Sequence, residues 1–378
     1  MKKEYLLTPG PTPLPPQISL AMAKPIIHHR TPQFQEILKE ASLGLKWAFQ
    51  TANDVFIISS SGTGAMEAAV INLLSCGDTA LVVHGGKFGE RWTEIAKAYG
   101  INAEIINVEW GKAVSPAEIS KRLKLNPQIK VVFTTLCETS TGVDNDIQAI
   151  ASVVKESSAV LVVDAISGLG AVDLKTDAWG VDVVVAGSQK GLMLPPGLGF
   201  ITVSPKAWKL VEVSKSSRYY LDLRKAKKAL DKNDTPFTSS ITLIIALNEA
   251  LKILQQDGLE NIFKRHKIMA DATRAAIKAL GLELFAPTAA SDGVTAAKVP
   301  EGIDGEKLVK TMRDTYGVTI AGGQAELKGK VIRIAHMGFI TESDIIMGLS
   351  CLEKVLTQMG YKFTLGTGVR AAEEVFLK

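Results

Sequence analysis

The sequence contains little cysteine, no long apolar run and no large excess of one charge. Its 378 residues include three cysteines, Cys76, Cys137 and Cys351. They form neither a CxxC pair nor an even disulfide set, so we expect reduced thiols. No run reaches the roughly 18 apolar residues of a membrane span. The first residues, 1–5, lead into proline-rich sequence without the apolar core of a signal peptide, so we expect a cytoplasmic protein.

Charge and composition indicate a globular protein. Lysine and arginine number 43 against 39 aspartate and glutamate, a net charge of +4, and 46% of residues are hydrophobic. This balance suits anionic small molecules but lacks the concentrated basic patch of nucleic-acid binding. The basic run 224–228 is interrupted by apolar residues and is typical of a solvated helix face. The length allows one large and one smaller domain.

Two strand-like apolar runs each lead to a charged residue. Val160–Asp164 ends in a carboxylate, and the run from Val183 leads to Lys190. Their separation fits a short crossover between neighbouring parallel strands, which would bring both side chains to one sheet edge. Pyridoxal phosphate needs such an amine for its Schiff base and such a carboxylate for its pyridine nitrogen. Alternatively, Asp164 is a polar strand end and Lys190 a surface lysine.

A glycine-rich turn predicts a phosphate site. Ser61-Gly62-Thr63-Gly64 follows an apolar strand and opens a helical stretch, whose free N–H groups and dipole favour an anion. The same pattern occurs in dinucleotide-binding folds. Here Glu67 stands where their third glycine belongs, and the region 85–87 replaces the expected acidic residue. A dinucleotide site is therefore disfavoured.

The order of elements predicts an α/β protein with a parallel sheet, followed by an α+β domain. We expect an extended arm at 1–20, a large domain at 21–257 and a small domain at 258–378. In the large domain we expect strands at 55–58, 80–83, 103–108, 131–135 and 200–203, and helices at 34–49, 88–99, 115–123 and 241–254. In the small domain we expect strands at 282–285, 294–299 and 330–335, and helices at 258–280, 305–316 and 342–356. The tail after Gly360 has no assignment.

Arg333 lies inside an apolar strand pattern, where a charge is costly without an anionic partner. Its planar fork of donors matches a carboxylate, which every amino acid and 2-oxo acid carries. A structural ion pair is the alternative. The adjacent His28 and His29 point different ways on any regular element and are poor joint metal ligands, so we expect no metal site.

Together these segments carry a family resemblance. Asp164-Ala165-Ile166-Ser167, Gly187-Ser188-Gln189-Lys190 and the glycine-rich turn resemble the class V aminotransferases of the pyridoxal-phosphate fold-type I superfamily, from Leu7 to about Leu356. The alanine–glyoxylate and serine–pyruvate aminotransferases are the most similar members. The resemblance implies a mostly parallel seven-stranded sheet between helices in the large domain, a smaller α+β C-terminal domain, and a homodimer with sites shared across its interface.

The resemblance also implies an activity and a set of roles. The activity is ping-pong transamination through a Lys190 Schiff base, from alanine or serine to glyoxylate or pyruvate. Gly10, in a Pro-Gly-Pro turn, and Arg333 would bind substrate, although the turn can also be a rigid entry segment. Thr238 would reach the partner's cofactor phosphate, although it is also a helix N-cap candidate. The implied cofactor-binding residues are Ser61, Gly62, Thr63, Phe88 (stacked on the pyridine), Thr139, Asp164, Ile166, Ser188, Gln189, Lys190 and Thr238.

Other interpretations remain open. Phe88 can be a core residue at a helix start, and Thr139 can belong to an ordinary turn. Thr235 stands where many relatives have tyrosine, so one contact between subunits can be missing. A cysteine desulfurase-type lyase would need a reactive cysteine in a mobile loop, a requirement that Cys137 and Cys351 meet poorly. A non-catalytic partner protein that retains the fold, or an aminoethylphosphonate transaminase, would share the same motifs.

Overall fold

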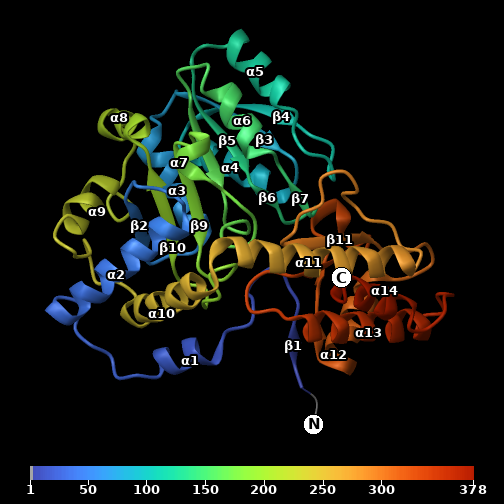
Figure 1. Cartoon of the computed structure of the whole chain (residues 1–378). Helices are drawn as coiled ribbons and strands as arrows, with labels where there is room; N and C mark the ends of the chain where they lie inside the picture. Colours follow the sequence, from blue (N-terminus) through green and yellow to red (C-terminus); the bar gives the residue numbers. More distant parts are fainter. Residues whose placement is uncertain (1–2) are drawn as a thin grey trace.

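A seven-stranded sheet forms the centre of the larger part of the molecule (Figure 1). The computed structural model describes residues 3–378. The strand order is β2-β10-β9-β8-β5-β3-β4, and β10 is antiparallel to both of its neighbours while the other pairs are parallel. The strands are β2 (Val55–Ile58), β3 (Thr79–His84), β4 (Asn102–Asn107), β5 (Ile129–Thr135), β8 (Val160–Asp164), β9 (Val183–Gly187) and β10 (Gly199–Val203).

Helices cover both faces of this sheet because its central strands are apolar on both sides. Along β8, Val160 and Val162 pack in one core and Leu161 and Val163 in the other. A strand buried on both faces reads as a continuous apolar run, which is what the sequence shows. One face packs against α3 (Gly62–Leu73), α4 (Lys87–Ala98) and α8 (Pro205–Val213), and the other against α2 (Pro32–Ala48), α5 (Pro116–Leu125), α6 (Ile147–Val154) and α10 (Ile241–Asp257).

The smaller part has its own antiparallel sheet and its own core, at the right of Figure 1. The sheet order is β11-β14-β13, formed by β11 (Val294–Lys298), β14 (Val331–Ala335) and β13 (Ala321–Gly322). Its helices are α11 (Leu259–Ala279), α12 (Gly305–Tyr316), α13 (Glu342–Gln358) and α14 (Thr367–Phe376). The helix α11 joins the two parts, since Ile262 packs in the larger core and Met269 in the smaller one. The domain limits at 257 and 258 stay a prediction.

The N-terminal segment connects with both parts. We expected an extended arm over residues 1–20, but the helix α1 (Pro16–Met22) begins within this range. Pro16 suits a first helical turn, and Ile18 and Ala21 are buried. Residues 1–2 of the predicted arm lie outside the described residues. Before α1, β1 (Tyr5–Leu6) pairs in parallel with β12 (Val318–Thr319) of the smaller part. The Thr12 N–H then donates to the carbonyl of Gln189, 3.2 Å away, beside the central sheet.

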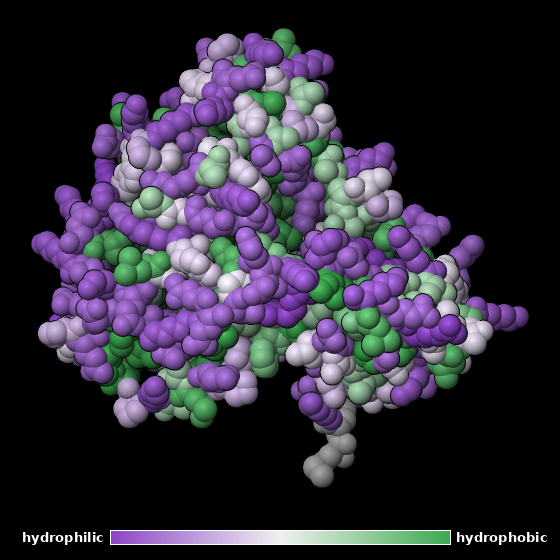
Figure 2. Space-filling view, viewed as in Figure 1, coloured by the Kyte–Doolittle hydropathy of each residue, from purple (hydrophilic) through white to green (hydrophobic). Residues whose placement is uncertain are grey.

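Two expectations for the smaller part are corrected. The predicted strand 282–285 forms a single bridge, Leu284 to Ala297, and the chain reaches Pro287 before further ladder bonds can form. The unassigned tail contains α14, which packs into the smaller core through Val369, Ala372 and Phe376. Among the described residues, no helix is long and apolar enough to cross a membrane. The face in Figure 2 is mostly hydrophilic, with apolar residues in small groups.

Candidate active site

Strand pairing brings the predicted site together at one sheet edge. Gly199 of β10 stands opposite both Ile58, at the end of β2, and Gly187, at the end of β9. The glycine-rich turn after β2 and the segment leading to Lys190 therefore emerge side by side. On the neighbouring strand, Asp164 pairs with Val185 of β9 and with Thr135 of β5. This edge holds the carboxyl ends of the parallel strands, where α/β sheets bind ligands.

Lys190 is a half-buried amine at this edge. Its Nζ donates a hydrogen bond to the Pro9 carbonyl of the N-terminal segment. Burial lowers the pKa of Lys190 to about 8, and the positive charges of Arg333 and Arg91 lower it further, while Asp164 acts in the opposite sense. A lowered pKa increases the fraction of neutral, nucleophilic amine near neutral pH. Gly10 lies so close that a Cβ there would come within 2.2 Å of Nζ.

Asp164 is a buried carboxylate at the end of β8, with 5% of its surface exposed. Its Oδ1 accepts a hydrogen bond from the Ile166 N–H, 2.8 Å away. Burial raises the pKa of Asp164 to about 7, Glu138 raises it further, and Ile166, Arg91 and Lys190 lower it. A partner that carries a proton would relieve this desolvated carboxylate.

The start of α3 lies beside the segment that leads to Lys190, and we call it the anion seat because we expect an anion to bind there. The Ser61 side chain makes no capping hydrogen bond, and the Gly64 N–H donates to the Ser61 carbonyl at 3.0 Å. The N–H groups of the first residues of a helix, here Gly62 and Thr63, have no acceptor in the preceding turn. A Cβ on Gly62 would come within 2.6 Å of Ile166 Cδ1, so a larger residue there would force the Ile166 side chain to shift. Gln189 faces this turn, since a Cβ on neighbouring Gly187 would lie 3.2 Å from Gln189 Oε1 and 3.5 Å from the Gly62 nitrogen. That buried Oε1 has no hydrogen-bond partner among the described residues.

Phe88 opens α4 beside the same turn. The Arg91 guanidinium lies over its ring, 5.0 Å from the ring centroid. Arg91 Nη1 also donates to Thr63 Oγ1, 3.3 Å away, and so joins α4 to the α3 turn. Our sequence reasoning did not single out Arg91. Its position three residues after Phe88 on one helix is the signal that places both on the same face.

Two predicted hydroxyls are bonded within the protein. The family resemblance implies that Thr139 lies near the ring hydroxyl or Asp164; here Thr139 Oγ1 donates to Ser167 Oγ, 2.6 Å away. Ser188 Oγ donates to the Pro195 carbonyl at 2.7 Å and accepts from the Leu198 N–H at 3.2 Å. These bonds hold the two loops that carry the site. Phosphate contact by Ser188 and ring contact by Thr139 remain predictions.

Arg333 is buried on β14, 5% exposed, and the acceptors it bonds are backbone carbonyls. Nε and Nη2 donate to the Gly322 carbonyl at 2.9 and 2.7 Å, and Nη1 donates to the Thr139 carbonyl at 2.9 Å. Burial lowers the pKa of Arg333 to about 10. No carboxylate lies within ion-pair distance of it among residues 3–378, so the structure does not support the alternative of a structural ion pair.

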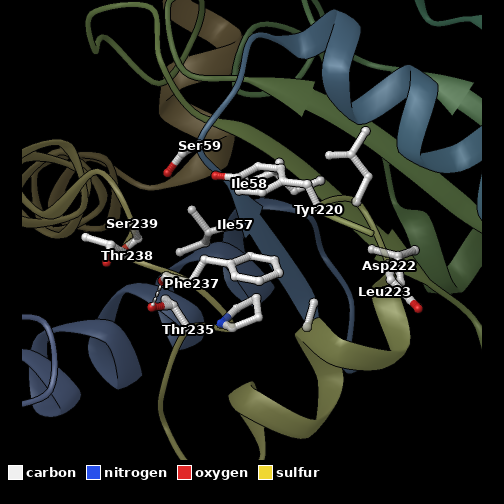
Figure 3. A pocket seen from close by; sticks show the side chains of 13 residues that line it. Ile57, Ile58, Ser59, Tyr220, Asp222, Leu223, Thr235, Phe237, Thr238 and Ser239 are labelled. Atoms are coloured by element: carbon white, nitrogen blue, oxygen red, sulfur yellow. Dashed lines mark hydrogen bonds between the residues drawn. The ribbon is translucent and has the colours of Figure 1, made fainter. Parts of the chain in front are cut away.

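Thr238 lies elsewhere within its own chain. It lines a separate hollow with Ser59 and Phe237, and the residues around that hollow do not include Lys190 or Asp164 (Figure 3). Thr238 Oγ1 lies 3.5 Å from His29 Nε2. The stacked rings of Tyr220 and Phe237, with centroids 5.2 Å apart, form the apolar side of the hollow. Contact between Thr238 and a partner's cofactor stays a prediction.

Sequence reasoning also missed Glu138, a fully buried carboxylate next to Thr139. Within a run of small polar residues it had the look of an ordinary turn, and no local signal separated it from its neighbours. In the described part of the chain, no group of three His, Cys, Asp or Glu side chains could hold a metal ion.

The fold and the site together define an α/β enzyme class in which a lysine amine and a buried carboxylate share a sheet edge with an anion seat. Comparison with known proteins agrees. The family described as "Aminotransferase class-V" matches residues 4–345. The chain belongs to this family.

Individual relatives span the whole chain. The "Soluble hydrogenase 42 kDa subunit" of Anabaena cylindrica is 47% identical and covers 99% of both chains. The "L-aspartate--glyoxylate aminotransferase" of Paracoccus denitrificans is 38% identical, over 98% of this chain and 95% of that one. Among solved structures, ureidoglycine-glyoxylate aminotransferase from Bacillus subtilis superposes with a TM-score of 0.96 at 29% identity, over 100% of this chain and 99% of that one. The chain is therefore an aminotransferase of class V.

Proposed function

We propose that this enzyme uses pyridoxal phosphate to transfer an amino group from alanine or serine to glyoxylate or pyruvate in a ping-pong cycle. The observation that carries this proposal is the joint placement of the Lys190 amine, the Asp164 carboxylate and the α3 turn at one sheet edge. When bound, the cofactor supplies an aldehyde for the amine and a ring that withdraws electrons. The unpartnered Gln189 Oε1 and the uncapped α3 turn fit its phosphate end.

Each residue has a role that follows from its surroundings. Lys190 would hold the cofactor, and its amine would take the proton from the donor's α-carbon as a base and return it as an acid. A pKa of about 8 suits both directions near neutral pH. Asp164 holds a proton at the ring nitrogen, because a buried carboxylate is stabilised by that proton. Arg333 directs its charge at the substrate carboxylate.

The proposed substrates are small because the sequence singles out no residue in 3–378 that is dedicated to a charged substrate side chain. Arg91 is a cation that affects the pKa of both Lys190 and Asp164, and it contacts Phe88 and Thr63. Aspartate, which the name of the Paracoccus relative gives as its donor, has a side-chain carboxylate that would pair with Arg91. A donor panel of alanine, serine and aspartate against glyoxylate and pyruvate separates the two cases.

The decisive experiment is cofactor uptake by the purified protein. We expect visible absorbance of the lysine-bound cofactor in the wild type and its loss in Lys190→Ala, together with a decrease in kcat on the order of 10²–10⁴-fold or more. No cofactor uptake by the wild type would refute the proposal. Release of sulfide from cysteine would favour a lyase, although Cys137 and Cys351 are both buried.

The name of the Anabaena relative favours a second candidate, a subunit of a larger assembly that need not catalyse transamination. The two functions differ in one measurement. If the protein is a binding subunit, the wild type shows no turnover in the donor panel, and Lys190→Ala still binds the assembly partner. If it is the proposed enzyme, the wild type shows turnover and Lys190→Ala loses it.

We also propose a homodimer with shared sites, because Thr238 lies apart from Lys190 in its own chain. Mixing two inactive variants tests this arrangement. If Thr238 acts across the interface, heterodimers of Lys190→Ala with an inactive Thr238 variant regain one intact site and part of the activity. If Thr238 acts within its own chain, they regain none.

A further inference from the structure

The buried carboxylate of Glu138 has no part in the proposed reaction, yet it bonds to the residues that surround the site. Its Oε2 accepts from the Gly89 N–H at 2.8 Å, and its Oε1 accepts from the Phe88 N–H at 3.2 Å. Oε1 also accepts from the Ser140 N–H at 3.3 Å and from the Ser140 hydroxyl. The first turn of α4, which carries Phe88, is therefore fixed to the segment 138–140.

The same segment holds Arg333. The carbonyl of Thr139, directly after Glu138, accepts from Arg333 Nη1 at 2.9 Å. The Ser140 hydroxyl accepts from the Lys87 N–H at 3.0 Å and so ties α4 at a further point. A Cβ at Gly86 would lie 2.4 Å from Ser140 Oγ and 2.6 Å from Glu138 Cδ, so a larger residue there would displace these side chains. The segment 138–140 and the first turn of α4 therefore pack closely.

From α4 the contacts continue to the anion seat. Arg91, on the same turn as Phe88, donates to Thr63 Oγ1 at 3.3 Å. Thus a continuous set of contacts runs from Glu138 to the Phe88 ring, to Thr63 of the seat and, through Thr139, to Arg333. Burial raises the pKa of Glu138, while the hydrogen bonds from Ser140, Gly89 and Phe88 lower it and so favour the ionised form.

We propose that Glu138 is a positioning residue that fixes the Phe88 ring and Arg333 relative to one another. Cofactor orientation and carboxylate binding are then coupled through residues 138–140. This inference rests on the proposed function. Side chains positioned in this way must be locked by the contacts behind them, and small displacements are costly to binding and rate. A carboxylate is suited to this task because its two oxygens accept from several donors at once, whereas an amide has one oxygen.

The test substitution is Glu138→Gln, with Glu353→Gln as the matched control. Glu353 is likewise a buried carboxylate that accepts three N–H groups at a helix start, but it serves α14, away from the site. Both variants should unfold at lower denaturant concentration than the wild type. In Glu138→Gln alone, we expect the cofactor dissociation constant and the KM for the amino donor each to rise about tenfold. The visible circular dichroism per bound cofactor, which reports ring orientation, should fall as well.

The outcomes separate the hypotheses. If Glu138→Gln and Glu353→Gln have the same circular dichroism per bound cofactor and the same KM, Glu138 acts only as a helix cap. That result would overturn this inference and leave the proposed function intact. A wild type without cofactor uptake would overturn both. If Glu138→Gln does not fold, Ser140→Ala takes its place, since it removes one hydroxyl from Glu138 and from the Lys87 N–H; an unchanged dichroism there would overturn the inference equally.

Discussion

At the residue scale, Gly10 is the most demanding position of the site. Its φ of +115° is a conformation that L side chains rarely adopt, and a Cβ would lie 2.2 Å from the Lys190 amine. We therefore expect Gly10→Ala to reduce cofactor uptake at least about tenfold, beyond the cost of roughly 1 kcal/mol for backbone strain alone. Absorbance titration of the apoprotein with pyridoxal phosphate measures this effect.

Gly302 provides the control for that substitution. Its φ is +80°, and a Cβ would meet no atom within 4 Å. Gly302→Ala should therefore lose stability in urea through backbone strain and retain full uptake. Equal uptake by both alanine variants would mean that the close approach of Gly10 to Lys190 has no functional consequence.

Arg333 is a buried charge for which we propose a role in binding the substrate carboxylate. Two backbone carbonyls fix its guanidinium, and lysine cannot reach both with the same geometry. Arg333→Lys should raise the KM for both the donor and the acceptor about 10- to 100-fold, because both carry a carboxylate and a hydrogen bond to a charged group contributes roughly 1.5–3 kcal/mol. Steady-state kinetics in both half-reactions measure the change; an effect on the donor alone would contradict a shared carboxylate site.

At the element scale, α14 depends on a contact from another helix. Glu353 of α13 accepts from the Gly368 N–H at 2.8 Å, the Val369 N–H at 3.0 Å and the Gly366 N–H. Glu353→Gln replaces one accepting oxygen with a donor, so we expect a loss of about 1–3 kcal/mol in the free energy of unfolding. Urea denaturation measures it. Glu374→Gln, on the exposed face of α14, removes only a surface pair with Arg370 and should change stability by less than about 0.5 kcal/mol.

The elements also show what local sequence can predict. The central strands and the Asp164–Lys190 pair were predictable because a strand buried on both faces leaves a continuous apolar run with a charge at its end. The role of α14 was not predictable from the sequence, because its first turn is capped by Glu353 of α13, a contact that no local pattern encodes. The roles of Glu138 and Arg91 were not predicted for the same reason. Their partners are amides and hydroxyls of distant segments, which become neighbours only in the folded chain.

At the scale of the whole molecule, His266 joins the two parts. From α11, its Nδ1 bonds to the Ala171 carbonyl at 3.1 Å, and its Nε2 accepts from the Gly338 N–H at 3.2 Å. The first contact lies in the larger part and the second in the smaller. Gly338 in turn packs against the Lys190 carbonyl, 3.3 Å from where its Cβ would be. A neutral imidazole with its proton on Nδ1 satisfies both bonds, so protonation of Nε2 would break the contact with Gly338.

This arrangement predicts how stability depends on pH. Burial, reinforced by the charge of Arg265, lowers the pKa of His266 to about 4 in the folded chain, against 6.5 as its ordinary value. The folded state therefore binds fewer protons than the unfolded state between these values. Stability from this group is present above pH 6.5 and is lost as the pH falls toward 4, by about 2 kcal/mol between pH 7 and pH 5. His336, whose pKa burial lowers to about 3, acts in the same direction.

Two carboxylates oppose this trend, so a difference measurement is needed. Burial raises the pKa of Asp164 to about 7 and that of Asp144 to about 6, and the stability associated with them is lost as the pH rises through those values. His266→Asn retains a donor for Ala171 but cannot titrate in this range. We expect urea denaturation of the apoprotein at pH 5 and pH 7 to show a smaller difference in unfolding free energy for His266→Asn than for the wild type, by about 2 kcal/mol. Equal differences in the two proteins would mean that His266 has the same pKa in the folded and unfolded chains, and that its burial at the junction between the two parts does not disfavour the protonated form.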